Sequence, residues 1–323
     1  IRIEHSRAIR ISNCDISGWG SPGTRDPLTR LFVDPRRRLI CSCAGISLES
    51  SRNCVVERTY FHDPAARSSG WAYGHPVGPV AMWVNNLEGT VIRWNDFIGS
   101  DDEFRWNDVI EGGGGNVAPD AGFRRDADIY GNYFAFPHDD GIELDGGQMN
   151  VRVFENKFEG GFCGISTIAC SRGPSYIWSN LLVNAGDADG AANIALKDMY
   201  RPPHIGRIYY FNNTIVGLGT GFPATPDRMR RNQVVAVTET AGSASAPANR
   251  QTDVRRELLW SASGRQTRNA GAESLTIPPR FVDAARGLYA LERDFPTAGQ
   301  GVRIPGFASP WLGALPPGCE EAG

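Results

Sequence analysis

Apolar residues in this chain occur in short runs that alternate with polar residues, and long helical patterns are scarce. Such alternation is typical of strands with one buried face. One phrase returns along the chain: an apolar residue, two variable residues, a ladder position that is usually asparagine, one variable residue and a second apolar residue. It occupies ISNCDI (11–16), VERTYF (56–61), IRWNDF (92–97), IYGNYF (129–134), VFENKF (153–158), IWSNLL (177–182) and YFNNTI (210–215). Because 38 glycines and 21 prolines supply frequent turns, the pattern predicts an all-β protein.

The spacing of the phrase predicts a solenoid. Asn132, Asn156 and Asn180 follow one another at intervals of 24 residues, which is too short for a domain and too long for a hairpin. Longer intervals fit the same rung with a loop inserted. Asparagine suits a stacked turn, because its amide can bond the asparagines above and below and it tolerates left-handed backbone. We therefore expect a single-stranded right-handed parallel β-helix. The remaining ladder positions are Cys14, Thr59, Asn95 and Asn213.

Further strands are predicted between the phrases, at 45–49, 108–111, 140–145, 164–168 and 193–197. Alternate residues in each are apolar and should point inward. This aligns one inward stack, made of Ile46, Ile110, Ile142, Ile165 and Ile194. The outward neighbours are then Ser47, Glu111, Glu143, Ser166 and Ala195.

The organisation predicted along the chain is one structural domain in three parts. Residues 1–222 form the rungs, 223–256 a long loop or excursion, and 257–323 the terminal rungs and a capping tail. Residues 234–241 read as one more strand. A cap is expected because an open last rung presents unpaired backbone groups.

Composition excludes some functions. The net charge of −3 provides no broad basic field, so no nucleic-acid partner is expected, and no segment is apolar enough to predict a membrane partner. None of the seven cysteines forms a CxxC pair, which argues against zinc. Some disulfides are plausible, but the odd count leaves at least one thiol unpaired. The start at Ile1, without a signal peptide, indicates a processed or truncated form.

Acidic residues gather on one outward strip of the predicted solenoid. The alignment stacks Asp108 on Asp140 and Glu111 on Glu143, with about 4.8 Å between neighbouring strands. Carboxylates at that spacing repel one another. The repulsion is relieved by a bound cation, by raised pKa values or by a nearby arginine. The strip consists of Asp108 and Glu111 in segment 107–115, and His138, Asp139, Asp140, Glu143 and Asp145 in segment 136–147.

Each of these outcomes implies a different chemistry. A cation would define a calcium site, whereas a raised pKa would place a general acid beside a general base, as glycosidic hydrolysis requires. Arg105, Arg124 and Arg125 are the arginines near the strip in sequence. The alternative for Asp139 and Asp140 is a purely structural one, in which they bond backbone amides at a rung corner.

Three further kinds of residue complete the candidate site. His138 is either a proton carrier or a structural histidine. Lys197 is expected to stack toward Asp145, either as a proton-abstracting base or as a solvated partner of Asp198. Trp83 or Trp106, if exposed beside the strip, would form a platform on which a sugar ring stacks.

The stretch 94–216, and above all DDGIELDGGQMNVRVFENKF (139–158), resembles the pectate-lyase-like right-handed β-helix proteins of bacteria. Segment 279–301 resembles the closing segment of such proteins. The polygalacturonase-like hydrolases carry paired aspartates at a rung start and another aspartate one rung earlier, to which Asp139, Asp140 and Asp108 are similar. Their Gly-His-Gly and Arg-Ile-Lys motifs are absent here.

A calcium-dependent pectate lyase family is similar in another way. It carries Asp-Asp-Gly-x-Asp, an earlier aspartate and a later lysine base. Asp139, Asp140 and Glu143 match that motif with glutamate in the last place, and Asp108 matches the earlier aspartate. Lys197 would be the base, although it lies further along the chain than the pattern places it.

Residues and resemblance together predict a carbohydrate-active enzyme that cleaves a polysaccharide or oligosaccharide. Hydrolysis is slightly favoured over calcium-dependent β-elimination because it needs only carboxylates. The rival from another class is a non-catalytic glycan-binding or adhesin β-helix. The resemblance implies a secreted or periplasmic protein. The expected catalytic residues are Asp140, Glu143, Glu111, His138 and Lys197, the substrate contacts Arg124, Arg125, Trp83, Trp106 and Asp145, and the ligands of a possible calcium ion Asp108, Asp139, Asp140 and Glu143.

Overall fold

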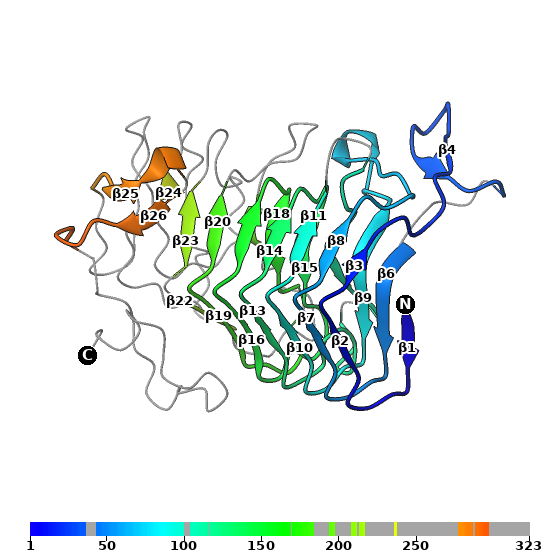
Figure 1. Cartoon of the computed structure of the whole chain (residues 1–323), viewed down its shortest axis with the longest axis horizontal. Helices are drawn as coiled ribbons and strands as arrows, with labels where there is room; N and C mark the ends of the chain where they lie inside the picture. Colours follow the sequence, from blue (N-terminus) through cyan, green and yellow to red (C-terminus); the bar gives the residue numbers. More distant parts are fainter. Residues whose placement is uncertain are drawn as a thin grey trace.

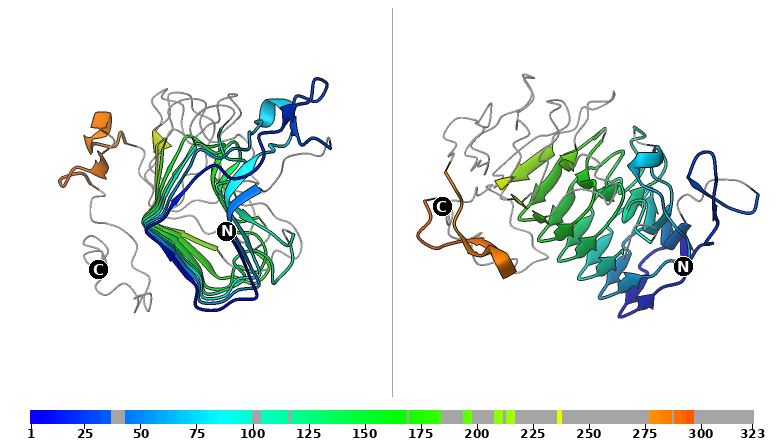
Figure 2. Two further views of the ribbon diagram at one scale, coloured as in Figure 1. Left: turned by 45° about the vertical axis from the view of Figure 1, so that its right-hand side comes forward. Right: turned by 90° about the horizontal axis from the view of Figure 1, so that it is seen from above.

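A computed structural model of the chain contains three long sheets in which every strand runs parallel to its neighbours. The chain visits the sheets in turn, so each rung adds one strand to each sheet (Figure 1). Viewed close to the long axis, the rungs superimpose on one another (Figure 2). The structure describes residues 1–36, 43–99, 104–115, 117–168, 170–183, 194–197, 208–211, 213–216, 236–237, 277–286 and 288–296.

The strands of each sheet are short, and their order in space follows the chain. The first sheet contains β1 (Arg2–Glu4), β6 (Cys43–Glu49), β9 (Pro79–Asn85), β12 (Ile110–Gly112), β15 (Asp140–Glu143), β18 (Cys163–Ser166) and β21 (Ile194–Lys197). The second contains β2 (Arg10–Ser12), β7 (Val55–Glu57), β10 (Val91–Arg93), β13 (Asp128–Tyr130), β16 (Val151–Phe154), β19 (Ser175–Trp178) and β22 (Ile208–Phe211). The third contains β3 (Asp15–Ile16), β8 (Tyr60–His62), β11 (Asp96–Ile98), β14 (Tyr133–Ala135), β17 (Lys157–Glu159), β20 (Leu181–Val183), β23 (Thr214–Val216) and β24 (Ala236–Val237). The predicted parallel β-helix is confirmed.

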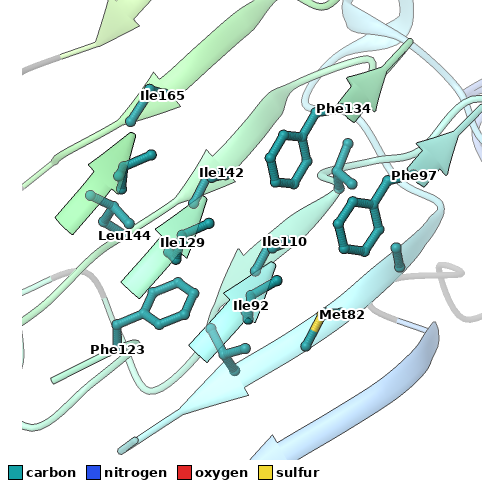
Figure 3. Packing of buried hydrophobic residues seen from close by; sticks show 14 of the residues in the cluster. Met82, Ile92, Phe97, Ile110, Phe123, Ile129, Phe134, Ile142, Leu144 and Ile165 are labelled. Carbon is teal, nitrogen blue, oxygen red and sulfur yellow. The ribbon is translucent and has the colours of Figure 1, made fainter. Parts of the chain in front are cut away.

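The core is a column of apolar side chains inside the solenoid (Figure 3). In the third sheet, four phenylalanines from successive rungs stack with ring centroids 4.7, 5.0 and 4.7 Å apart. All four are fully or almost fully buried, and one face of each strand supplies the column. The phenylalanines are Phe61, Phe97, Phe134 and Phe158.

The asparagine ladder lies in the turn between the second and third sheets. Asn132 Nδ2 donates to Asn156 Oδ1 at 2.9 Å, and Asn156 Nδ2 donates to Asn180 Oδ1 at 3.0 Å. Asn156 Oδ1 also accepts the backbone N–H of Asn132 at 3.0 Å, and Asn180 Oδ1 accepts that of Asn156 at 3.1 Å. The ladder is confirmed, but left-handed backbone falls one residue earlier, as at Gly131 (φ 63°). Glycine, or a residue strained into that region, turns the chain so that asparagine can face inward.

The predicted inward stack of the first sheet is correct in its centre and wrong at two places. Met82 lies between Ile46 and Ile110, and Leu196 rather than Ile194 pairs with Ile165. The first error arose because β9 reads PVAMWVN, which is apolar almost throughout and shows no clear alternation. The second is a slip of two residues, which keeps the same face inward and which an alternating pattern cannot detect. Consequently Lys197, not Ala195, is the outward neighbour of Ser166.

Elements outside the rungs project from the solenoid. Near its N-terminal end lie the antiparallel pair β4 (Thr24–Arg25) and β5 (Phe32–Val33) and the short helix η1 (Trp71–Tyr73) (Figure 1). Near the other end, β25 (Phe281–Asp283), η3 (Ala284–Arg286) and β26 (Leu288–Leu291) form an antiparallel hairpin within segment 279–301. The strand expected in 234–241 is present as β24. Most of the predicted loop 223–256 and of 257–323 lies outside the described residues.

The cysteines in the described part of the chain are free thiols: Cys14, Cys43, Cys54, Cys163 and Cys170. Cys41 and Cys319 lie outside it. Among the described residues no helix has the length and apolar character needed to cross a membrane.

We predict that Asn156→Ala destabilises the fold strongly. The substitution removes hydrogen bonds to Asn132, Asn180 and the Ile129 carbonyl, and leaves buried groups unpaired. Each such group costs about 1–3 kcal/mol, so we expect a loss of about 2–4 kcal/mol in the free energy of unfolding. Urea denaturation measures it. Asn85→Ala is the matched control, since Asn85 makes one long bond of 3.5 Å to Glu49, and the two variants should differ clearly. Equal losses would contradict the prediction.

Candidate carboxylate and lysine site

The candidate site lies on the outer face of the first sheet. The register between strands places one row of outward residues along this face, which we call the outward row. Ile110 pairs with Ile142, so Glu111 lies opposite Glu143, as the sequence predicts. Neighbours in the row are about 4.8 Å apart along the solenoid. The row consists of Arg2, Ser47, Trp83, Glu111, Glu143, Ser166 and Lys197.

Five carboxylates converge at the centre of this face and form the carboxylate cluster: Asp108, Glu111, Asp139, Asp140 and Glu143. One oxygen each of Asp108, Asp139 and Asp140 lie within 4.8 Å of one another. The same holds for Asp108, Glu111 and Glu143. Asp108 belongs to both groups, and its side chain is 4% exposed. The two groups therefore form one continuous acidic site across β12 and β15, and such groups can hold a metal ion.

Backbone hydrogen bonds between rungs fix these side chains. Asp108 Oδ1 accepts the N–H of Asp140 at 2.8 Å, and its Oδ2 accepts from Asn107 Nδ2 at 2.9 Å. The purely structural reading thus fits Asp108 better than Asp139 or Asp140. Gly141 follows the aspartate pair because a Cβ there would meet the Gly164 carbonyl oxygen at 2.6 Å. The glycine allows close approach of the next rung, which brings Asp140 into the sheet.

Lys197 supplies the positive charge of the site. Its Nζ forms an ion pair with Asp140 Oδ2 and lies 3.9 Å from Asp139 Oδ1. The prediction that Lys197 stacks toward Asp145 is wrong because of the two-residue slip in β21. Burial alone would lower the pKa of Lys197, but the charge of Asp140 outweighs it and holds the pKa well above its usual range. The ion pair with Asp140 therefore favours the charged ammonium form of Lys197.

Burial raises the pKa of several carboxyl groups. Desolvation, with repulsion from Asp140, raises the pKa of Asp139 to about 8. The same two causes raise the pKa of Asp145 to about 8. Desolvation also raises the pKa of Asp108 and Glu143 well above their usual ranges, with the neighbouring carboxylates adding to the effect. Without a further cation, the site cannot hold all of its carboxylates ionised.

Some oxygen atoms of the site accept no hydrogen bond and could instead contact a cation. Among the described residues, Asp139 Oδ1, Asp140 Oδ1 and Asn107 Oδ1 are buried and accept no hydrogen bond. Buried oxygens of this kind are costly unless a ligand satisfies them. Hard cations such as Ca²⁺ and Mg²⁺ prefer oxygen ligands, so the residues fit such an ion.

A loop that the repeat does not predict lies beside the cluster. Ser69 and Val77 bridge its ends, and it contains η1. His75 Nε2 in this loop lies 3.6 Å from Asp139 Oδ2, and the Trp71 ring lies 4.9 Å from the Phe162 ring. Sequence reasoning missed His75 and Asn107. His75 sits in an insertion with no periodic signal, whereas NDVIE in segment 107–115 already contained Asn107.

Other residues expected at the site lie elsewhere. Arg124 Nη1 donates to Asn86 at 3.2 Å and Arg125 Nη2 to Glu88 at 2.6 Å, so Lys197, and not these arginines, offsets the cluster. Trp106 is fully buried, donates to the Ala135 carbonyl at 3.0 Å and stacks on Trp19. It is therefore no sugar platform.

The other three residues expected at the site, His138, Asp145 and Trp83, lie in or beside it. His138 is 1% exposed, and its backbone N–H donates to the Trp106 carbonyl at 2.9 Å. Asp145 is 1% exposed and flanks the cluster beyond Glu143, so it is placed to affect its charge rather than to contact a large substrate. Trp83 is half-buried and belongs to the outward row beside Glu111.

Comparisons with known proteins identify no relative: no protein-family model, no curated protein and no solved structure matches this chain.

The raised carboxyl pKa values predict how stability depends on pH. In the unfolded chain aspartate titrates near pH 4, whereas Asp139 and Asp145 titrate at about 8 when folded. Between these values the folded state binds more protons, so the free energy of unfolding falls as pH rises from about 4 to about 8. Each group contributes at most about 1.4 kcal/mol per pH unit.

Denaturation with chelator present, at pH 5 and pH 8, measures this slope. Asp145→Asn removes one of the two groups while keeping its shape, and should therefore lose less stability over the interval than the wild type. An Asp145→Asn slope as steep as that of the wild type would contradict the assignment.

Proposed function

We propose that this protein cleaves an acidic polysaccharide by β-elimination next to a uronate unit. The observation that carries the proposal is the position of Lys197 on the outward row, with its amine against Asp140. From sequence alone hydrolysis was slightly favoured because it needs only carboxylates, and Lys197 was expected to stack toward Asp145. The register of β21 brings the Lys197 amine to Asp140, which supports Lys197 as a candidate base, and for this reason we now place elimination first.

In this reaction Lys197 acts as the neutral amine. Because the charge of Asp140 raises the pKa of Lys197, the ammonium would first pass its proton to solvent when a bound cation takes over the charge of Asp140. Its neutral amine takes the proton from the carbon that bears the uronate carboxylate. The electron pair of that C–H bond forms a carbon–carbon double bond, and the bond from the adjacent carbon to the glycosidic oxygen breaks. The departing oxygen takes a proton from solvent. Asp140 positions the amine, and Glu143 and Glu111 border the substrate along the outward row.

A divalent cation is part of the proposal. The resemblance to calcium-dependent pectate lyases suggests Ca²⁺, held by Asp108, Asp139, Asp140 and Glu143. When bound, such an ion neutralises the uronate carboxylate and so makes the adjacent C–H more acidic. Asp139 Oδ1 and Asp140 Oδ1, which are buried and accept no hydrogen bond, support a site for it, as does the raised pKa of the cluster's carboxyl groups.

Hydrolysis is the second candidate, and one observation favours it. Carboxylate oxygens of Glu111 and Glu143 lie within 4.8 Å of each other, close to the separation of about 5–5.5 Å between the carboxyl groups of retaining glycosidases. The pKa of Glu143 is raised, by desolvation first and by the charge of Asp145 second, which suits a general acid. In that case Lys197 would serve only as the countercharge of Asp140. The rival without catalysis remains a glycan-binding β-helix.

Cation binding can be tested without substrate. We expect Ca²⁺ at a hundred times its dissociation constant to stabilise the protein by about 2.7 kcal/mol relative to chelator, because only the folded state assembles the cluster. Asp139→Asn should abolish most of this gain. Asp126→Asn is the matched control, since Asp126 is a partly exposed aspartate that pairs with Arg125, accepts from Asn150 and belongs to neither group of the carboxylate cluster. Thermal unfolding and titration calorimetry measure both, and a calcium-independent stability would argue against the metal.

Cleavage can be tested with a panel of uronate-containing and neutral polysaccharides. Elimination yields new reducing ends together with ultraviolet absorbance from the unsaturated product, whereas hydrolysis yields reducing ends alone. We expect the former, with Lys197→Ala reducing kcat by about 10²–10⁴-fold because general-base catalysis is lost. Lys157→Ala is the control: Lys157 is the other lysine of the chain and pairs with Glu159 on the third sheet, 2.7 Å away.

The outcomes separate the candidates. Reducing ends without absorbance, with Glu143→Gln inactive and Lys197→Ala active, would replace elimination by hydrolysis. A panel without any product would count against both and in favour of a glycan-binding role.

A further inference from the structure

An open groove continues the outward row on the N-terminal side of the carboxylate cluster. It has a volume of about 370 Å³ and is lined by Ile1, Arg2, Ala44, Ser47 and Trp83. The two strands nearest the end of the first sheet, β1 and β6, supply most of this lining, and β9 supplies the tryptophan. The groove lies on the same face as the cluster, because Ser47 and Trp83 belong to the row that contains Glu111.

The backbone holds the Trp83 ring in place. A Cβ at Gly113 would lie 2.3 Å from Trp83 Cζ2 and 2.8 Å from its Nε1, so the indole packs directly on the glycine backbone of the next rung. No side chain larger than hydrogen at Gly113 leaves room for this arrangement. The glycine run that follows Glu111 therefore serves a purpose beyond turning the chain, since it seats an aromatic ring one strand away from the cluster.

The distance from Trp83 to the cluster is short. Trp83 pairs with Glu111 across adjacent strands, and neighbouring strands are about 4.8 Å apart. A chain molecule lying along the outward row would therefore pass from Glu143 and Glu111 directly onto the indole. On the other side of Trp83 the row contains Ser47 and Arg2.

We propose that this groove is a binding subsite for one acidic sugar unit, whose ring stacks on Trp83 and whose carboxylate faces Arg2. The flat apolar face of a pyranose ring matches an indole, and the hydroxyl of Ser47 offers a polar partner between the two side chains. The inference builds on the proposed function, from which it takes the polymer, and adds the place where the unit next to the cleavage site is held.

Charge favours an acidic unit over a neutral one at this end. The Arg2 guanidinium is the cation of the groove and lies on the side of Trp83 away from the cluster's negative charge. It is partly neutralised by Glu4, which accepts its Nε–H at 2.7 Å. Arg2 is highly exposed, so its contribution to binding is smaller than that of the tryptophan.

Binding should be measured separately from cleavage. The probes are a uronate oligosaccharide long enough to reach the groove and the corresponding neutral oligosaccharide, titrated by calorimetry in chelator so that no elimination occurs. Trp83→Ala should weaken binding of the uronate oligosaccharide by about tenfold through loss of stacking. Arg2→Ala should weaken it about two- to fivefold and leave the neutral oligosaccharide unaffected. Trp83→Phe keeps an aromatic ring at this position and should therefore retain most of the affinity.

Trp94→Phe and Trp94→Ala are matched controls, because Trp94 is an exposed tryptophan in the turn after β10 and packs on Arg93. A second readout is the dependence of KM on chain length, which Trp83→Ala should reduce and Trp94→Ala should leave as it is in the wild type.

The two proposals fail in different ways. If the protein cleaves the polymer but Trp83→Ala binds the oligosaccharide as the wild type does and shows the same dependence of KM on chain length, the subsite is overturned. Elimination then stands. Trp83-dependent binding without cleavage overturns elimination and leaves the subsite. Equal effects of Trp83→Ala and Trp94→Ala would also overturn the subsite, since the loss would then not be specific to the groove.

Discussion

The alignment of successive rungs by backbone hydrogen bonds is the constraint on which the rest of this structure depends, and the asparagine ladder locks it. Asn156, for example, accepts from Asn132 on one side, donates to Asn180 on the other, and donates to the Ile129 carbonyl of the preceding rung. A rung therefore cannot slide along its neighbour without breaking several buried hydrogen bonds at once. The same register stacks the inward phenylalanines of the third sheet on one another.

The site on the first sheet follows from this fixed register. Parallel pairing sets one residue of each strand above the equivalent residue of the next, so acidic residues at equivalent positions accumulate charge across rungs. The fold holds Asp108, Asp139 and Asp140 together although they repel, and the cost appears as raised pKa values and as buried oxygens without donors. Lys197 offsets part of that charge. Carboxylates held together in this way favour binding of a cation, protonation of one or more of their members, or both.

Much of this could be predicted from the sequence, because the ladder phrase marks each turn and the alternation marks each inward face. The stacking of Glu111 on Glu143 followed directly from the spacing. The position of Lys197 could not be read in the same way, since residues two apart on a strand share a face and Ile194 and Leu196 are equally apolar. His75 lies in an inserted loop, and the burial of Trp106 depends on Trp19 and on the Ala135 carbonyl, which are distant in sequence.

Asp140 and Lys197 are 57 positions apart in the sequence, and one strand of the first sheet, β18, lies between theirs. Because each rung of a solenoid contacts only its neighbours, rungs can be gained or lost at the ends without disturbing the centre. Between β15 and β21 the count is fixed, since one additional rung would carry the amine about 4.8 Å further from its carboxylate. Loops between strands are free to vary in length there, but the number of turns is not. From β15 to β21 the number of rungs is thus set by a single ion pair.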